Sequence, residues 1–145
     1  MLETTIDKFI FRIQEDLYYN ETGVWVTVEG SRARVGLSDF AQQLNGDVAF
    51  ASVAPTGTQV KATQVFGNIE TVKAILELPS PVTGRIVEVN PDLENSPELI
   101  NQDPYGKGWM AVLELDRWEE EKSALLDAPQ YLELVKRQAE TEMKK

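Results

Sequence analysis

The chain has 145 residues, 42% of them hydrophobic, and its 24 acidic and 14 basic side chains give a formal net charge of −10. This length and composition predict one folded domain, and the negative charge disfavours nucleic acid and anionic membranes as partners. Cysteine and histidine are both absent, which excludes disulfides, thiolate metal sites, cysteine nucleophiles and Ser-His-Asp triads, so redox or nucleophilic chemistry must come from an attached group.

The N-terminal residues do not predict a secretory signal. Residues 1–8 carry acids and threonines, whereas a secretory signal would have a basic segment followed by an apolar one. No apolar run is long enough to span a bilayer. We expect a cytoplasmic protein in which residues 1–17 form an N-terminal extension.

The middle of the chain predicts short strands separated by glycine and proline. Residues 24–28 and 33–37 are expected to form a hairpin, and Ser38 is a suitable N-cap for a short helix over residues 39–44 that Gly46 ends. Further strands are expected at residues 47–53, 59–60, 64–71, 84–89 and 109–115, with another between Lys73 and Pro79. So many short strands indicate a β-sandwich or a flattened barrel.

A weak internal repeat runs through these strands. Residues 46–53 are echoed by residues 84–90, and each segment is a glycine followed by alternating residues. The connector at residues 71–81 would lie near a pseudo-twofold axis between two similar halves. It contains Lys73.

The tail differs in composition. Residues 116–145 hold little glycine and much Glu, Lys, Leu and Ala, which predicts one helix over residues 116–126 and a second from Ala128 onward, fraying beyond Glu140. Pro129 marks the break between them. We expect both helices to pack on the sandwich, with a docking helix for a partner as the alternative. The aromatic residues Trp25, Phe50, Phe66 and Trp109 are expected in the core.

The most informative segment surrounds Lys73. Its local pattern alone suits an ordinary solvated lysine. However, Glu70-Thr71-Val72-Lys73-Ala74 resembles the Glu-Ser-Val-Lys-Ala attachment core of lipoyl carriers, and Ser80-Pro81-Val82-Thr83-Gly84 resembles the Ser-Pro-Val-Ser-Gly that follows it. With further matched segments between Tyr18 and Tyr131, the sequence is most similar to the H-protein family of the glycine cleavage system.

This resemblance implies a mainly β, lipoyl/biotinyl-type barrel-sandwich hybrid of two similar halves, with a short internal helix and C-terminal helices. Residues 18–115 would form the carrier domain, and residues 116–145 a helical segment packed on it. The resemblance also implies lipoate bound covalently to Lys73, with Glu70, Val72, Ala74 and Glu77 recognised around it, and neither a metal nor catalytic residues.

The implied partners are a lipoyl ligase or lipoyltransferase, glycine decarboxylase, aminomethyltransferase and dihydrolipoyl dehydrogenase. The arm would carry an aminomethyl group between the enzymes of glycine cleavage. Biotinyl domains flank their lysine with methionines, and lipoyl domains of 2-oxoacid dehydrogenases place Asp before it. Val72 and Ala74 fit neither pattern, which favours the H-protein type.

The sequence departs from the family pattern at a residue that would face the amine of the arm when the arm carries its aminomethyl group. Val24 stands where the family has a carboxylate, so we expect an apolar cleft in which Glu77 is the remaining counter-charge. Two alternatives stay open. The first is an H-protein-like carrier of sulfur intermediates for a heterodisulfide-reductase-like complex in the cytoplasm, and the second is an unmodified lipoyl-like scaffold that binds a partner.

Overall fold

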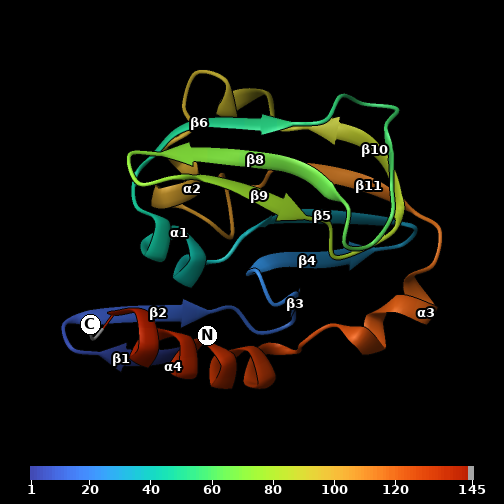
Figure 1. The fold of residues 1–145 in the computed structure, drawn as a ribbon. Coiled ribbons are helices and arrows are strands. Elements are labelled where there is room, and N and C mark those ends of the chain that lie inside the picture. Colours follow the sequence, from blue (N-terminus) through green and yellow to red (C-terminus); the bar gives the residue numbers. More distant parts are fainter. Residues whose placement is uncertain (144–145) are drawn as a thin grey trace.

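Three antiparallel sheets make up the β structure of residues 1–143. The computed structural model describes residues 1–143 (Figure 1), and Lys144 and Lys145 of the predicted helical segment lie outside the described residues. The six-stranded sheet has the order β3-β4-β5-β11-β10-β7, the three-stranded sheet β6-β8-β9, and the third sheet is the hairpin β1-β2. The bounds are β1 (Leu2–Ile6), β2 (Phe9–Ile13), β3 (Tyr18–Tyr19), β4 (Val24–Glu29), β5 (Arg32–Leu37), β6 (Val48–Val53), β7 (Gln59–Val60), β8 (Val65–Thr71), β9 (Ile75–Pro79), β10 (Gly84–Val89) and β11 (Ala111–Leu115).

The prediction of two similar halves is confirmed. The neighbours β6-β8-β9 of the three-stranded sheet correspond to the neighbours β10-β11-β5 of the six-stranded sheet, so each of these sets holds two strands from one half and one strand from the other half. Both β6 and β10 contain a bulge. The register of β6 shifts between Val48 and Phe50, and that of β10 shifts between Ile86 and Glu88. The passage from β8 to β9, where one half gives way to the other, contains Lys73.

The main core lies between the three-stranded and the six-stranded sheets. Strands of both sheets contribute alternate apolar residues to it, as the period of two requires. Its fully buried members include Val24, Val26, Val35, Leu37, Phe66, Ile69, Leu78, Ile86 and Leu113.

Two of the four aromatic core predictions are confirmed and one is wrong. Trp25 and Phe66 are buried, and Trp109 is half-buried beneath the guanidinium of Arg34, 5.0 Å from its ring centroid. Phe50 is 68% exposed. Strict alternation from the buried Val48 would place Phe50 inside, but the bulge inserts an extra residue and turns Phe50 to the outer face.

The predicted helix after β5 is confirmed as α1 (Asp39–Asn45). The hydroxyl of Ser38 accepts a hydrogen bond from the Ala41 N–H at 3.2 Å, as an N-cap should. Gly46 ends the helix with a positive φ of 88°. The same Ser38 hydroxyl lies 2.7 Å from the hydroxyl of Tyr131, which joins α1 to the C-terminal helix.

The C-terminal segment differs from the predicted pair of helices. Residues 118–124 form only α3 (Trp118–Glu121) and a 3₁₀ turn, η2 (Lys122–Ala124), before α4 (Ala128–Met143) begins. Three of the four residues of α3 are glutamates, and two of these, Glu119 and Glu120, are exposed, so the helix has little apolar surface to bury. Two further short elements connect β10 to β11, namely η1 (Pro91–Leu93) and α2 (Leu99–Gln102).

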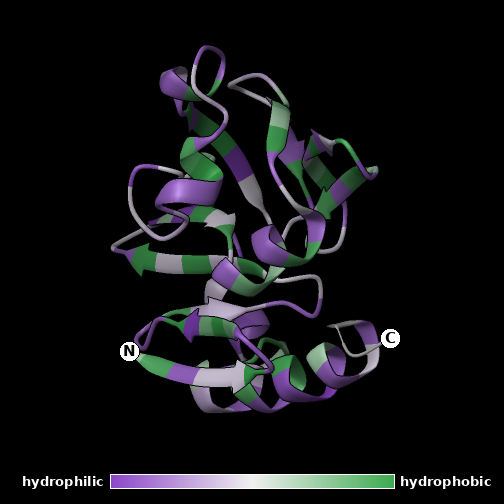
Figure 2. Ribbon diagram, turned by 90° about the vertical axis from the view of Figure 1, so that its left-hand side faces the viewer, coloured by the Kyte–Doolittle hydropathy of each residue, from purple (hydrophilic) through white to green (hydrophobic). Residues whose placement is uncertain are grey.

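Residues 1–17, expected only as an extension, contain the hairpin β1-β2. Buried Ile6, Phe11 and Ile13 form a second apolar cluster with Tyr131, Val135 and Ala139 of α4. Figure 2 shows this hairpin and α4 together as a layer beneath the sandwich. The apolar side of α4 is therefore covered within the chain, which does not support a docking helix for a partner.

Candidate functional site

Lys73 lies at the tip of the hairpin formed by β8 and β9 (Figure 1). The two strands pair up to Glu70 and Ile75, and the Thr71 N–H donates to the Ala74 carbonyl at 2.9 Å to close the turn. Only Val72 and Lys73 remain between these closing residues. Both are exposed, and Val72 has 97% of its surface free.

The Thr71 side chain fixes this turn. Its hydroxyl oxygen accepts from the N–H groups of Lys73 at 3.2 Å and of Ala74 at 3.3 Å. The hydroxyl is also 3.3 Å from the Ala74 carbonyl, to which it donates. A small hydroxyl residue at this position therefore binds the backbone on both sides of the lysine, as serine and threonine do in tight turns. The root of the lysine is held while its side chain projects from the hairpin.

The amine of Lys73 is available for acylation. Its Nζ donates to the Leu44 carbonyl in the last turn of α1, at 3.2 Å. No ion pair among residues 1–143 involves Lys73. An amide nitrogen would keep one N–H, so acylation does not require this hydrogen bond to be lost. An exposed primary amine on a firm turn fits a covalently attached acyl group.

The other predicted recognition residues lie around this tip. Val72 and Ala74 flank the lysine, and both are exposed. Glu70 is half-buried near the end of β8, and Glu77 is exposed on β9 opposite Asn68. The structure thus brings all four residues to one hairpin. Phe50, which the sequence placed in the core, also lies here, exposed on β6 and paired with Glu70 on β8.

The expected role of Val24 is wrong. Val24 is the first residue of β4, has no exposed surface, and belongs to the main core. It therefore does not line a cleft in which it could face an amine. Its side chain packs among the buried residues between the two sheets, and this packing accounts for an apolar residue here.

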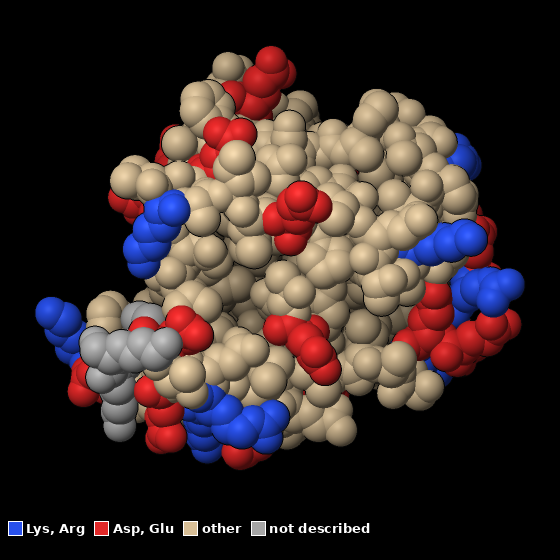
Figure 3. Space-filling model, viewed as in Figure 1, with Lys and Arg blue, Asp and Glu red and all other residues tan. Residues whose placement is uncertain are grey.

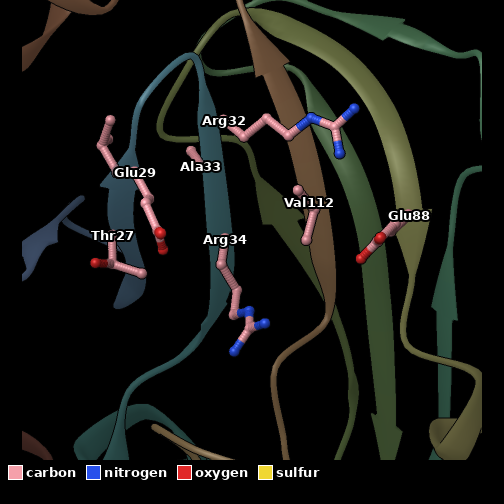
Figure 4. Close-up of a pocket in the computed structure, with 8 residues that line it drawn as sticks. Thr27, Glu29, Arg32, Ala33, Arg34, Glu88 and Val112 are labelled. Atoms are coloured by element: carbon pink, nitrogen blue, oxygen red, sulfur yellow. The ribbon is translucent and has the colours of Figure 1, made fainter.

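Two hollows lie elsewhere on the surface, and Lys73 lines neither. One, of about 490 Å³, lies over β4, β5, β11 and β10, where Glu29, Arg32, Arg34 and Glu88 surround Val112 (Figure 4). The other, of about 480 Å³, lies beyond the far end of β9. Its lining includes Pro79 and three carboxylates, Glu21, Glu120 and Glu121. The lysine is thus presented on a projecting turn, apart from both of these hollows.

Comparison with known proteins decides the family. The sequence profile of the glycine cleavage H-protein family matches residues 17–138. The chain belongs to this family. It is 45% identical over 124 residues to the glycine cleavage system H protein of Bacillus subtilis, which covers 85% of this chain and 96% of that protein. The H protein of Salinibacter ruber is 43% identical over 121 residues, covering 83% and 97%.

A solved structure agrees with this family. The crystal structure of a glycine cleavage system H protein from Mycobacterium marinum matches with a TM-score of 0.76 and 29% identity, covering 83% of this chain and 97% of that one. The mainly β sandwich expected from the sequence is thereby confirmed.

Family membership establishes the kind of protein. As an H protein it is a lipoyl carrier of the glycine cleavage system and not an enzyme, and its family carries lipoate on a lysine. It works with enzymes of that system. The sulfur-carrier alternative is not favoured by these relatives. No helix within residues 1–143 is long and apolar enough to cross a membrane.

Proposed function

We propose that Lys73 is the residue that carries lipoate. The observation that carries this proposal is its position, since Lys73 stands at the tip of a closed hairpin turn whose backbone Thr71 fixes. Exposure alone would not select it, because Lys8, Lys61 and Lys107 are exposed too. Glu70, Val72, Ala74 and Glu77 are the residues we assign to recognition of this site.

The attached lipoyl group supplies the reactive disulfide, and the chain holds the point of attachment in a fixed position. Lysine and an eight-carbon acyl chain together reach about 14 Å by standard bond lengths. A rigid root and a flexible arm of that length keep the disulfide at high local concentration for each docked enzyme. The role of this chain is therefore to bind partners while holding one end of the arm.

The specific partners follow from this role. A lipoyl ligase or lipoyltransferase would acylate Lys73, and glycine decarboxylase, aminomethyltransferase and dihydrolipoyl dehydrogenase would use the arm in turn. We assign all of these encounters to the cytoplasm. The net charge of −10 supports docking on surfaces that carry basic residues.

Peptide mapping tests the attachment site. The purified chain is incubated with a lipoyl ligase, lipoate and ATP, digested, and analysed by mass spectrometry. We expect one lipoyl group, on the peptide that contains Lys73, and none on Lys73→Arg. Lys61→Arg and Lys107→Arg are matched controls that should be modified like the parent chain. Modification of a different lysine in the parent chain would refute the assignment.

A further inference from the structure

An exposed apolar patch borders the attachment turn. Phe50 on β6, Ile75 on β9 and Val72 in the turn are 68%, 65% and 97% exposed; we call these three residues the Phe50 patch. Exposed apolar side chains that gather at one place mark contact sites for partners more often than those scattered singly. In the space-filling view, the surface over β6, β8 and β9 is mostly uncharged (Figure 3).

The strand register places two residues of the patch, Phe50 and Ile75, in one row with Glu70. Phe50 pairs with Glu70, and Glu70 pairs in turn with Ile75. Directly paired residues project from the same face of a sheet, on strands about 4.8 Å apart. A single carboxylate therefore stands between two exposed apolar side chains, close to the turn that holds Lys73.

The reach of lysine distinguishes two classes of partner. An enzyme that acylates Nζ must bring its active site to within about 6 Å of the Lys73 Cα, because the extended lysine side chain spans only about this distance. Such an enzyme has to cover the turn and the strand ends beside it. Enzymes that use the far end of the arm, about 14 Å away, are under no such requirement.

We propose that the Phe50 patch is the docking surface for the enzyme that acylates Lys73, and this rests on the proposed function. Phe50 and Ile75 fit an apolar contact surface on that enzyme, and Glu70 between them calls for a facing basic side chain. Large aromatic residues near the centre of an interface commonly account for much of its binding energy. Phe50 is placed to serve in this way.

The test compares acylation of threonine variants, which keep the β-branched shape that suits a strand. Phe50→Thr and Ile75→Thr are assayed for kcat/KM with a purified lipoyl ligase, lipoate and ATP, and modification is read at Lys73 by mass. Val65→Thr is the matched control, since Val65 is also exposed, at 45%, but lies at the opposite end of β8. We expect a decrease of about tenfold or more for Phe50→Thr, a smaller one for Ile75→Thr, and none for Val65→Thr.

A second measurement separates acylation from use of the arm. Fully lipoylated Phe50→Thr, prepared by prolonged incubation, is assayed in glycine–bicarbonate exchange with glycine decarboxylase, and we expect a rate within about twofold of the parent. If Phe50→Thr loses acylation and exchange equally, the patch is not specific to the acylating enzyme. If Phe50→Thr is acylated at the parent rate, the patch is not a docking surface for that enzyme. Melting temperatures check folding. If the parent chain gains no mass at Lys73, the attachment assignment fails instead.

Discussion

Thr71 shows how one hydroxyl can prepare an attachment site. It occupies the position of serine in the attachment core of the family, and its oxygen accepts from two consecutive N–H groups. Threonine keeps the oxygen that serine would supply, so the substitution preserves the turn. The family motif pointed to this position, but its physical reason becomes visible only in the hydrogen bonds.

We predict that Thr71→Val slows acylation of Lys73 about twofold to tenfold, whereas Thr71→Ser does not. Valine has the same shape but no hydroxyl, and losing such hydrogen bonds typically costs about 0.5–1.5 kcal/mol. The rate of mass gain at Lys73 measures the effect. Equal rates for the valine and serine variants would show that the turn is held by its backbone alone.

Val24 leads to a prediction about stability. Since it has no exposed surface and lies in the main core, Val24→Glu would bury a carboxylate with no partner. We expect a loss of about 3 kcal/mol or more in the free energy of unfolding, measured by urea denaturation. Val24→Ala is the control for lost volume alone and should cost less. A stable Val24→Glu protein with faster glycine–bicarbonate exchange would contradict this account.

At the scale of elements, Tyr131 of α4 contacts both β3 and the N-cap of α1. Its ring stacks on Tyr19 with centroids 4.3 Å apart, and its hydroxyl lies 2.7 Å from the Ser38 hydroxyl that caps α1. Gly23 lies close by with φ of 97°, and a Cβ at that position would come within 2.8 Å of the tyrosine oxygen. Glycine therefore permits both the turn and the contact.

This contact predicts a dependence of stability on alkaline pH. Burial raises the pKa of Tyr131 above that of a free tyrosine, so the folded state keeps its proton where the unfolded state, with a pKa of about 10, has lost it. Stability is unaffected well below pH 10 and falls above it, by at most about 1.4 kcal/mol per pH unit for this group. Urea denaturation at pH 9 and pH 11 should show a smaller decrease for Tyr131→Phe. Because burial also raises the pKa of Tyr19 and Tyr105, a reduced slope remains. An unchanged slope would argue against the effect.

The strands of the sandwich were predictable from sequence to a degree that other elements were not. The alternation and the bounding glycines placed β4, β5, β7 and β10 within a residue or so of their observed bounds. The hairpin β1-β2 was missed because its turn, Asp7 and Lys8, contains neither glycine nor proline, although burial alternates along both strands. Its apolar face packs against α4. The bulge in β6 has no signal in the sequence, so alternation placed Phe50 in the core. The exposed apolar surface beside Lys73 was therefore not predicted.

At the scale of the whole molecule, the buried apolar side chains of residues 1–143 form two clusters. The main core belongs to the sandwich that carries Lys73, and the second cluster joins the hairpin β1-β2 to α4. The family match begins at residue 17, so this hairpin lies outside it. The hairpin covers an apolar face of α4 that would otherwise meet water.

We predict that deleting residues 1–16 lowers the melting temperature by at least about 5 °C but leaves the acylation of Lys73 within about twofold. The deletion exposes Tyr131, Val135 and Ala139 while the sandwich core stays intact, and a loss of about 1 kcal/mol shifts the midpoint by several degrees in a domain of this size. Calorimetry and the mass assay measure the two effects. Loss of acylation in a deletion variant that still melts cooperatively would mean that the hairpin serves the attachment site.

The central claim is that this chain carries glycine-cleavage intermediates on Lys73. The most direct measurement is glycine–bicarbonate exchange by glycine decarboxylase, supplied with the chain after treatment with lipoyl ligase and lipoate. The account predicts exchange with the parent chain and with Lys61→Arg, and only the background rate with Lys73→Arg, although Lys73→Arg keeps the positive charge and should fold normally. Exchange by Lys73→Arg at the parent rate would contradict it.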